Sequence, residues 1–223
     1  MIKLILLYLK NIKNYGLYIS IKILFYEIYN ILILKNIKDL SYDDTSTSTY
    51  NNSKLQQKYD VPYIPTPFYF LRIIYKYFEI NKLDNIVFFD LGCGFCRPAI
   101  YLKKKINMNF LGFEINKEII SKLNINKYSN FRIFNLSLRQ IKNIQKIINQ
   151  NLSSTNVNIF FISDTVEIEL INEIYQIFTT KNKIILIFVN SKIEKFINNN
   201  FELSKKIEFK NKTRNIAFYR NFK

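Results

Sequence analysis

Short apolar runs along the chain alternate with segments in which apolar residues recur at helical spacing. Each run has the length of a strand that is buried on both faces. The expected strands are Val87–Asp90, Asn109–Glu114, Phe131–Asn135, Val157–Ser163 and Lys183–Asn190. The expected helices are Phe68–Phe78, Ala99–Lys105, Lys117–Leu123, Glu167–Phe178 and Ser191–Asn199. Strands that alternate with helices predict a parallel α/β sheet.

A different pattern closes the chain. Phe201–Phe209 and Asn215–Arg220 are two further strand-like segments, joined by the polar residues 210–214, and they predict an antiparallel hairpin. The 223 residues are enough for one domain with a substantial core and an extension. A content of 48% hydrophobic and 22% charged residues is typical of a folded chain.

Residues 1–40 form an apolar segment interrupted by lysines, which we expect to be a helical arm. Its apolar runs are shorter than the roughly 18 residues that a spanning helix needs, and no small-residue cleavage site follows the first run. We therefore expect neither a transmembrane anchor nor a secretion signal. Six lysines against Glu27 and Asp39 give the arm a net charge of +4. The arm either packs on the domain or lies on a membrane surface as an interfacial helix.

Residues 41–60 are rich in Ser, Thr and Asp, which hydrogen-bond their own backbone and favour a loop. This segment is either a linker or a lid that folds over a bound ligand and excludes water. The expected organisation is a helical arm at 1–40, a polar loop or lid at 41–60 and a ligand-binding domain at 61–223.

The stretch from Val87 to Pro98 carries the clearest chemical signal. An apolar strand ends at Asp90, two glycines permit a tight turn, and Pro98 suits the first turn of a helix. A helix that begins after such a turn offers unpaired N–H groups to a ligand. About twenty residues further on, Glu114 ends the next strand, where nucleoside sites place a carboxylate for ribose hydroxyls.

The spacing within this stretch argues against a dinucleotide. In the pattern Gly-x-Gly-x-x-Gly the third glycine would follow Gly92 and Gly94 at position 97, where the chain has Arg97. Asp90 directly before the turn would also repel a pyrophosphate, but its carboxylate can pair with an amino group. S-adenosylmethionine carries an ammonium and a sulfonium, so it fits this acid better.

The sequence Asp-Leu-Gly-Cys-Gly at 90–94, followed by Glu114, resembles the first two motifs of the class I S-adenosylmethionine-dependent methyltransferases. The usual pattern has a third glycine, which is Cys96 here. The resemblance extends to a bacterial group of these enzymes with a Tyr-x-Pro-Thr-Pro segment ahead of the motif, as at 63–67. It implies a Rossmann-like methyltransferase fold. That fold has a seven-stranded, mostly parallel sheet of order 3-2-1-4-5-7-6, with strand 7 antiparallel.

The resemblance also implies how the cofactor would be held. Asp90 and the backbone of Gly92, Cys93 and Gly94 would bind the methionine end of S-adenosylmethionine. Glu114 would bind the ribose.

Further roles follow from the resemblance with less support from the residues alone. Thr66 and Tyr63 would lie beside the methionine end, although Tyr63 could instead pack in the core. Asn135 would contact the adenine. Asp164 follows the strand at 157–163. At this position the amino methyltransferases of nucleic acids have the motif Asn-Pro-Pro-Tyr. The chain lacks this motif, which removes support for adenine or cytosine methylation. Asp164 is then either a general base or substrate-orienting carboxylate, or only the N-cap of the next helix.

Composition narrows the chemistry. The chain has no histidine, so no step can use an imidazole base or a His-ligated metal. Cys93 and Cys96 could form a redox pair but cannot complete a zinc site, and small side chains in the glycine turn explain them more simply. Free thiols favour a reducing cytoplasm. The net charge of +16 is spread along the chain; it reflects a Lys- and Asn-rich composition or an anionic partner.

The expected function is transfer of a methyl group from S-adenosylmethionine to an oxygen or nitrogen of an acceptor. A small molecule or sugar is favoured as the acceptor because no appended recognition domain is visible. A protein side chain comes next and nucleic acid third. The alternative is a non-catalytic methyltransferase-fold protein that serves in interactions or at a membrane surface, which the replacement of the third glycine by Cys96 favours.

Overall fold

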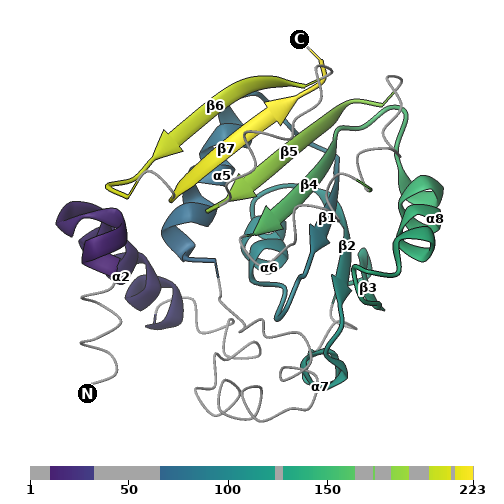
Figure 1. Cartoon of the computed structure of the whole chain (residues 1–223), viewed down its shortest axis with the longest axis horizontal. Helices are drawn as coiled ribbons and strands as arrows, with labels where there is room; N and C mark the ends of the chain where they lie inside the picture. The colour runs from purple at the N-terminus through teal and green to yellow at the C-terminus, as the bar shows by residue number, and fades with distance from the viewer. Residues whose placement is uncertain are drawn as a thin grey trace.

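A seven-stranded sheet forms the centre of the protein, with strand order β3-β2-β1-β4-β5-β7-β6 (Figure 1). The computed structural model describes residues 11–32, 66–123, 128–163, 173, 182–190, 201–211 and 214–222. The strands are β1 (Ile86–Leu91), β2 (Met108–Glu114), β3 (Phe131–Asn135), β4 (Asn158–Ser163), β5 (Ile184–Val189), β6 (Glu202–Glu208) and β7 (Asn215–Arg220). The first five are parallel, and β7 runs antiparallel to both β5 and β6. The predicted strand order and directions are therefore confirmed.

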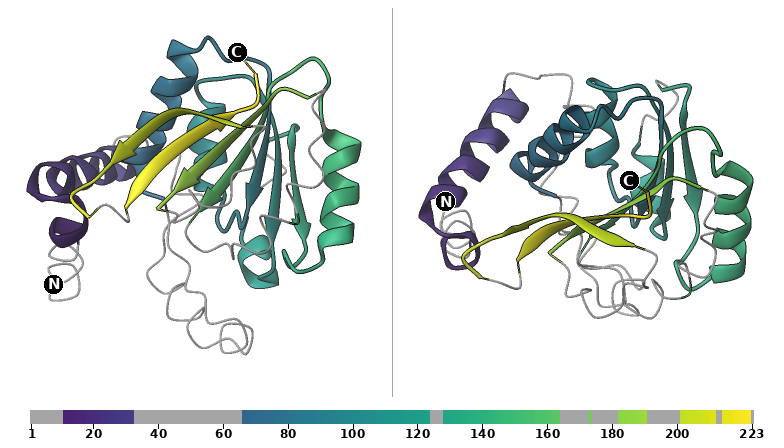
Figure 2. Two further views of the ribbon diagram at one scale, coloured as in Figure 1. Left: turned by 45° about the horizontal axis from the view of Figure 1, so that its top comes forward. Right: turned by 90° about the horizontal axis from the view of Figure 1, so that it is seen from above.

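Helices cover both faces of this sheet (Figure 2). They are α2 (Leu17–Leu32), α5 (Phe68–Ile80), α6 (Arg97–Lys103), α7 (Lys117–Ser121) and α8 (Ile141–Asn151). Apolar side chains of α5 and α6 pack on one face of the sheet, and those of α8 pack on the other. The sheet is thus the middle layer of three.

Side chains on the central strands β1, β2, β4 and β5 alternate between two apolar layers. On β1, Phe88 faces the layer that contains α5 and α6, whereas Val87 and Phe89 face the layer that contains α8. Phe89 stacks on Phe160 of β4, with ring centroids 4.6 Å apart. Burial on both faces explains why these strands read as continuous apolar runs in the sequence.

Most boundaries agree with the prediction to within two residues. The helix α6 begins at Arg97 instead of Ala99, and α7 ends at Ser121 instead of Leu123. The hairpin is confirmed by β6 and β7. The helices expected at 167–178 and 191–199 lie, apart from residue 173, outside the described residues.

Two helical features differ from the expectation. The helix α8 was not predicted, because its apolar positions are separated by Lys, Asn and Gln and form only a narrow stripe, of which Ile144 and Ile148 are fully buried. The helical arm expected over 1–40 is interrupted at Gly16, whose φ of +81° lies in the left-handed region that a right-handed helix cannot use. Residues 11–15 are helical before this break, and α2 follows it.

The helix α2 packs against the domain beside α5 (Figures 1 and 2). Its Ile23 is buried and belongs to the same apolar cluster as α5 and α6. In the described part of the chain no helix is long and apolar enough to cross a bilayer. The helix α2 is thus a packed element on the side of the sheet that carries α5 and α6.

Candidate functional site

The turn after β1 lies at the carboxyl ends of the parallel strands and is fixed to the end of β2. Gly92 and Gly94 have φ angles of +94° and +49°, which residues with a Cβ rarely adopt. The N–H groups of Gly92 and Cys93 both donate to the carbonyl oxygen of Phe113, at 3.0 and 2.9 Å. Cys96, in place of the third glycine, adopts a left-handed φ of +55°, at a strain of about 1–2 kcal/mol. The turn is therefore kept despite the substitution.

The side chain of Cys93 packs inside the protein against β2. A Cβ atom added to Gly112 would lie 2.7 Å from Cys93 Sγ, so β2 needs a glycine there to make room for the thiol. Cys93 is 4% exposed, and burial raises the pKa of its thiol well above the ordinary value. A buried neutral thiol is a poor nucleophile. Any contact of Cys93 with a ligand would be made by its backbone.

Asp90 places a carboxylate inside the protein near the end of β1. Asp90 is 2% exposed, and its Oδ2 atom has no hydrogen-bond partner within the described part of the chain. Burial, followed by the charge of Glu114, raises the pKa of Asp90 well above its ordinary value. Burying a carboxylate without completing its hydrogen bonds is unfavourable. Asp90 is therefore suited to a ligand that brings a cation or N–H donors.

Glu114 organises the turn with both of its carboxylate oxygens. Oε2 accepts the N–H of Gly94 at 2.9 Å, and Oε1 accepts the N–H of Asn116 at 2.8 Å. Burial raises the pKa of Glu114, and these backbone N–H groups, with that of Ile115, oppose the rise. The sequence predicts a ribose contact for Glu114 and gives no sign that its carboxylate also binds the backbone of the turn. The position at the end of β2 is as predicted, and each oxygen retains a second lone pair for a ligand hydroxyl.

Asn116 was also missed by the sequence analysis. Its side-chain oxygen accepts the N–H groups of Glu118 and Ile119, at 2.9 and 3.3 Å, and so caps the N-terminus of α7. An asparagine directly before a helix is a recognised N-cap signal that could have revealed it. Because Glu114 binds the backbone of this cap, the start of α7 and the glycine turn are held by one side chain.

Asn135 joins the ends of β2 and β3. Its Nδ2 donates to the carbonyl oxygens of Glu114 and Ile115, at 3.1 and 3.0 Å, and its side chain is exposed. Asn135 therefore lies beside Glu114 at the edge of the site. The expected contact of Asn135 with adenine stays a prediction.

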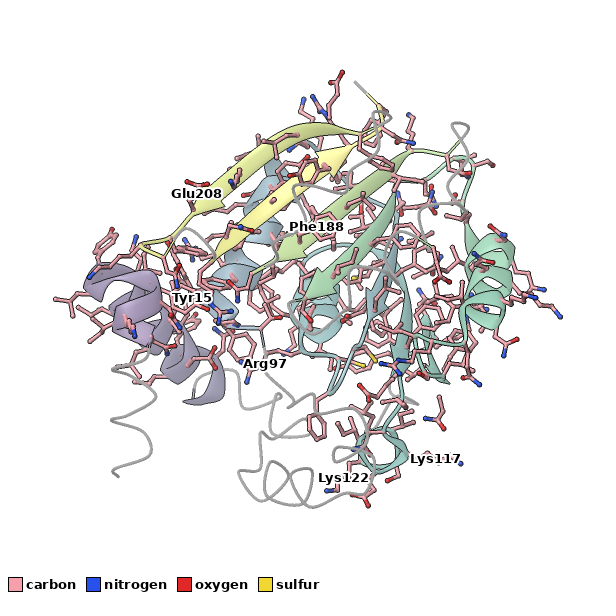
Figure 3. The ribbon with its side chains drawn as sticks, viewed as in Figure 1. Tyr15, Arg97, Lys117, Lys122, Phe188 and Glu208 are labelled. Atoms are coloured by element: carbon pink, nitrogen blue, oxygen red, sulfur yellow. The ribbon has the colours of Figure 1, made fainter. Side chains whose placement is uncertain are left out.

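The N-terminal arm reaches the glycine turn through Glu27 of α2. Oε2 of Glu27 lies 2.9 Å from Nη1 of Arg97, the first residue of α6, and Oε1 accepts the N–H of Phe68 at 2.9 Å. Nη1 of Arg97 also lies 3.4 Å from the carbonyl oxygen of Thr66. Figure 3 shows Arg97 between α2 and the sheet. Thr66, predicted to line the cofactor site, is thus buried at a junction that holds the arm, α5 and the turn together.

The two predicted catalytic residues, Tyr63 and Asp164, lie outside the described residues. Asp164 directly follows Ser163, the last residue of β4, and β4 pairs with β1 in parallel. Among the described residues, no group of three or more His, Cys, Asp or Glu side chains could hold a metal ion.

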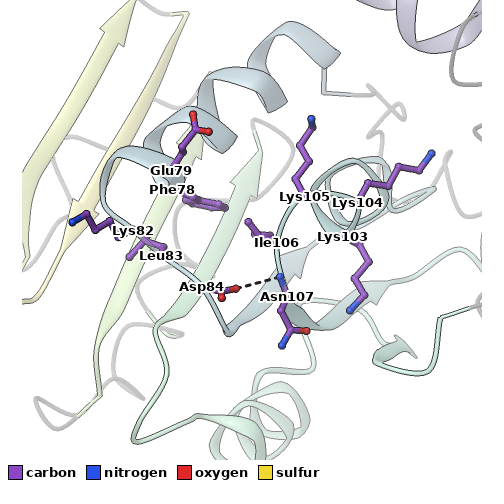
Figure 4. A pocket seen from close by; sticks show the side chains of 10 residues that line it. All are labelled: Phe78, Glu79, Lys82, Leu83, Asp84, Lys103, Lys104, Lys105, Ile106 and Asn107. Carbon is purple, nitrogen blue, oxygen red and sulfur yellow. Dashed lines mark hydrogen bonds between the residues drawn. The ribbon is translucent and has the colours of Figure 1, made fainter.

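A hollow of about 750 Å³ lies at the opposite end of the sheet (Figure 4). It is lined by residues that precede β1 and β2, including Lys82, Asp84 and Lys103. Asp84 Oδ1 accepts the N–H of Asn107 at 3.4 Å there. In parallel α/β sheets, ligands bind at the carboxyl ends of the strands. Because this hollow lies at the amino ends, we assign the functional site to the glycine turn instead.

Solved structures provide the comparison with known proteins. The chain is similar to the Escherichia coli protein yhhF, which is assigned as a methyltransferase, with a TM-score of 0.50 and 13% identity over 67% of this chain and 84% of that one. A Staphylococcus aureus protein assigned as a caffeoyl-CoA O-methyltransferase matches with a TM-score of 0.47 and 12% identity, over 84% of this chain and 96% of that one. The sequence matches no protein-family model and no curated protein.

The strand order, the antiparallel β7 and the likeness to yhhF define the fold as the Rossmann-like fold of class I methyltransferases. The resemblance of the sequence motifs implied this fold. At 13% identity the likeness establishes the fold, and the argument for an activity has to come from the residues of the site.

Proposed function

We propose that the protein is an S-adenosylmethionine-dependent methyltransferase. The state of Asp90 carries this proposal, because its carboxylate is buried beside the glycine turn and one oxygen has no hydrogen-bond partner among the described residues. An ammonium group would supply the charge and the N–H donors that this carboxylate lacks. The fit is specific to a ligand with a cationic end, since an anionic phosphate at the same place would be repelled.

The surrounding residues fit the rest of such a cofactor. Gly92 and Gly94 have no Cβ, so a ligand can approach the backbone closely. The second lone pairs of the Glu114 carboxylate would accept ribose hydroxyls, and Asn135 beside it would contact the adenine. Thr66 would lie near the methionine end. When bound, S-adenosylmethionine supplies a methyl group activated by a positively charged sulfur.

The residues of the chain would then align the acceptor and manage its proton. Asp164, the residue that follows β4 in the sequence, would take the proton that the acceptor oxygen or nitrogen loses, and Tyr63 would orient the acceptor. Residues 41–60 would close over the site and exclude water. The favoured acceptor is a small molecule or a sugar, followed by a protein side chain and then by nucleic acid.

The two cysteines bear on the compartment. Both thiols are free and buried, and free thiols are typical of reducing compartments. We therefore propose a cytoplasmic location.

Two measurements test the proposal in sequence. S-adenosylhomocysteine should raise the melting temperature of the purified protein, and incubation with methyl-labelled S-adenosylmethionine and a cell extract should label a product. The size of that product, and its sensitivity to protease or nuclease, identifies the acceptor class. Absence of any stabilisation by S-adenosylhomocysteine contradicts the proposal. Stabilisation without transfer in extracts of several growth states supports the non-catalytic alternative, a methyltransferase fold that serves in interactions.

A further inference from the structure

One face of α2 presents a row of large apolar side chains to the outside of the molecule (Figure 3). Nine large hydrophobic residues are exposed in the described part of the chain, and seven of them belong to this helix. They are 41% to 68% exposed and are Leu17, Tyr18, Ile21, Leu24, Phe25, Ile28 and Tyr29. We call this set the α2 outer face. Single exposed apolar residues are ordinary, but a contiguous row marks an interaction surface.

The opposite side of the same helix is already occupied. Ser20, Ile23 and Asn30 are buried there, and Glu27 binds Arg97 and the backbone of the domain. The spacing of these inward positions is helical, so the helix cannot rotate to bury its outer face without breaking the inner contacts. The α2 outer face is therefore a fixed feature of the folded protein.

Positive charges lie along the flanks of α2. The ammonium of Lys22 lies 4.1 Å from the centre of the Tyr18 ring and so borders the outer face directly. The guanidinium carbon of Arg72 lies 5.0 Å from the centre of the ring of Tyr26, which packs against the core beside that face. Lys13 is exposed one turn before the helix, and Lys210 of the hairpin packs beside Gly16 at its start. Glu27 is the only acidic residue of α2, and it points inward. The surface thus combines an apolar row with a cationic rim.

We propose that the α2 outer face lies on the surface of an anionic lipid bilayer. The 16 residues of α2 span about 24 Å along the helix axis, which suits a helix lying in the plane of the interface. Aromatic side chains such as those of Tyr18 and Phe25 prefer the boundary between hydrocarbon and headgroups. The cationic rim would contact anionic headgroups while the apolar row enters the bilayer.

Charge also decides between a bilayer and a second copy of the chain. Each chain carries a net charge of +16, and an isologous contact through α2 would bring the two cationic rims together. Like charges across an interface oppose association, whereas an anionic surface attracts this rim. The inference is independent of the proposed methyl transfer, because it uses neither Asp90 nor the glycine turn.

Vesicle flotation tests this proposal with the full chain. The protein should float with vesicles of equal parts phosphatidylcholine and phosphatidylglycerol, and much less with phosphatidylcholine alone. Added salt should weaken the binding, because headgroup attraction is screened. The double variant Ile21→Glu/Phe25→Glu should reduce partition at least about tenfold, since two apolar side chains no longer enter the bilayer. Lys13→Glu/Lys22→Glu should selectively weaken binding to the anionic vesicles.

The matched control is Ile80→Glu, which replaces an apolar residue that is 70% exposed at the far end of α5. It should bind vesicles like the wild type, and unchanged melting curves would show that all variants fold. Three results would overturn the proposal. They are failure of the wild type to float with anionic vesicles, equal loss of binding in Ile80→Glu and the α2 variant, and a dimer in light scattering that Ile21→Glu/Phe25→Glu dissociates.

Discussion

Replacing Asp90 by Asn should have opposite effects on stability and on cofactor affinity. Asp90 is 2% exposed, and one of its oxygens has no partner within the described part of the chain. In the protein without ligand, the substitution removes a buried charge that nothing compensates. In the complex, the same substitution removes the negative partner of the ligand's ammonium group. A residue with a merely structural role would not produce this pair of effects.

The expected sizes follow from the burial of Asp90. Asn keeps a polar side chain of the same size at this buried position, so the gain in stability comes from removing the charge alone. One unit of raised pKa corresponds to about 1.4 kcal/mol, so at neutral pH Asp90→Asn should raise the free energy of unfolding by about this amount for each unit by which burial raises the pKa of Asp90. For a domain of this size, each kcal/mol shifts the melting temperature by roughly 2–4 °C. Losing one partner of a desolvated charge pair costs about 2–5 kcal/mol. The affinity for S-adenosylhomocysteine should therefore fall by roughly 30-fold or more.

The pH dependence has a defined sign. The pKa of Asp90 is raised in the folded protein, so between the unfolded value of about 3.9 and the raised native value the folded chain binds more protons than the unfolded one. The contribution of Asp90 to the free energy of unfolding of the wild type therefore falls as pH rises through that window, and it levels off above the native pKa. The stability gain of Asp90→Asn should be present at neutral pH and should vanish below about pH 4.

The assay compares wild type, Asp90→Asn and the control Asp84→Asn by denaturant unfolding and by calorimetric titration with S-adenosylhomocysteine. Asp84 is an exposed acid just before the same strand, at the end away from the turn, so its substitution should leave affinity unchanged. Wild-type affinity should also weaken as pH falls toward the raised pKa of Asp90, because the carboxylate must lose its proton to bind an ammonium. Unchanged affinity in Asp90→Asn would refute the role given to this carboxylate. A loss of stability equal to that of other core substitutions would refute the burial argument.

Three further predictions concern the packing around the turn. Gly112→Ala places a methyl group 2.7 Å from Cys93 Sγ, so it should lower the free energy of unfolding by about 1–3 kcal/mol in denaturant titrations. Adding Cys93→Ala should restore part of the lost stability. Glu27→Gln removes the charge paired with Arg97, whose side chain is 12% exposed, and should lower the free energy of unfolding by about 1–2 kcal/mol. A melting temperature that does not depend on salt in either wild type or variant would count against a stabilising role of this ion pair. Cys96→Gly should leave the melting temperature unchanged or raise it, because φ at this position is left-handed. Cys96→Val should lower the melting temperature by several degrees, since β-branched residues avoid this region. Equal effects of the two substitutions would contradict the strain at Cys96.

Local patterns were enough to predict the strands and the position of the cofactor turn. The strands β1, β2, β4 and β5 are buried on both faces, so almost every position is apolar and the runs stand out against the polar connections. The turn is just as visible, because its glycines and Pro98 must satisfy local backbone geometry. The helix α8 escaped prediction because one narrow apolar stripe suffices to pack it on the face of the sheet. The strand order came from the motif resemblance, since alternation of strands and helices alone does not fix which strands are neighbours.

The sequence by itself determined that an acid, a glycine turn and a second acid would occupy the ends of two successive strands. Only the tertiary structure decided what each acid does. Among the residues that the structure describes, one oxygen of Asp90 has no partner, whereas both oxygens of Glu114 bind the backbone of Gly94 and Asn116. Likewise, the contact between Glu27 and Arg97 joins residues 70 positions apart. The physical reason is that burial and hydrogen-bond partners depend on how distant segments pack, and local sequence patterns carry no record of which segments those are.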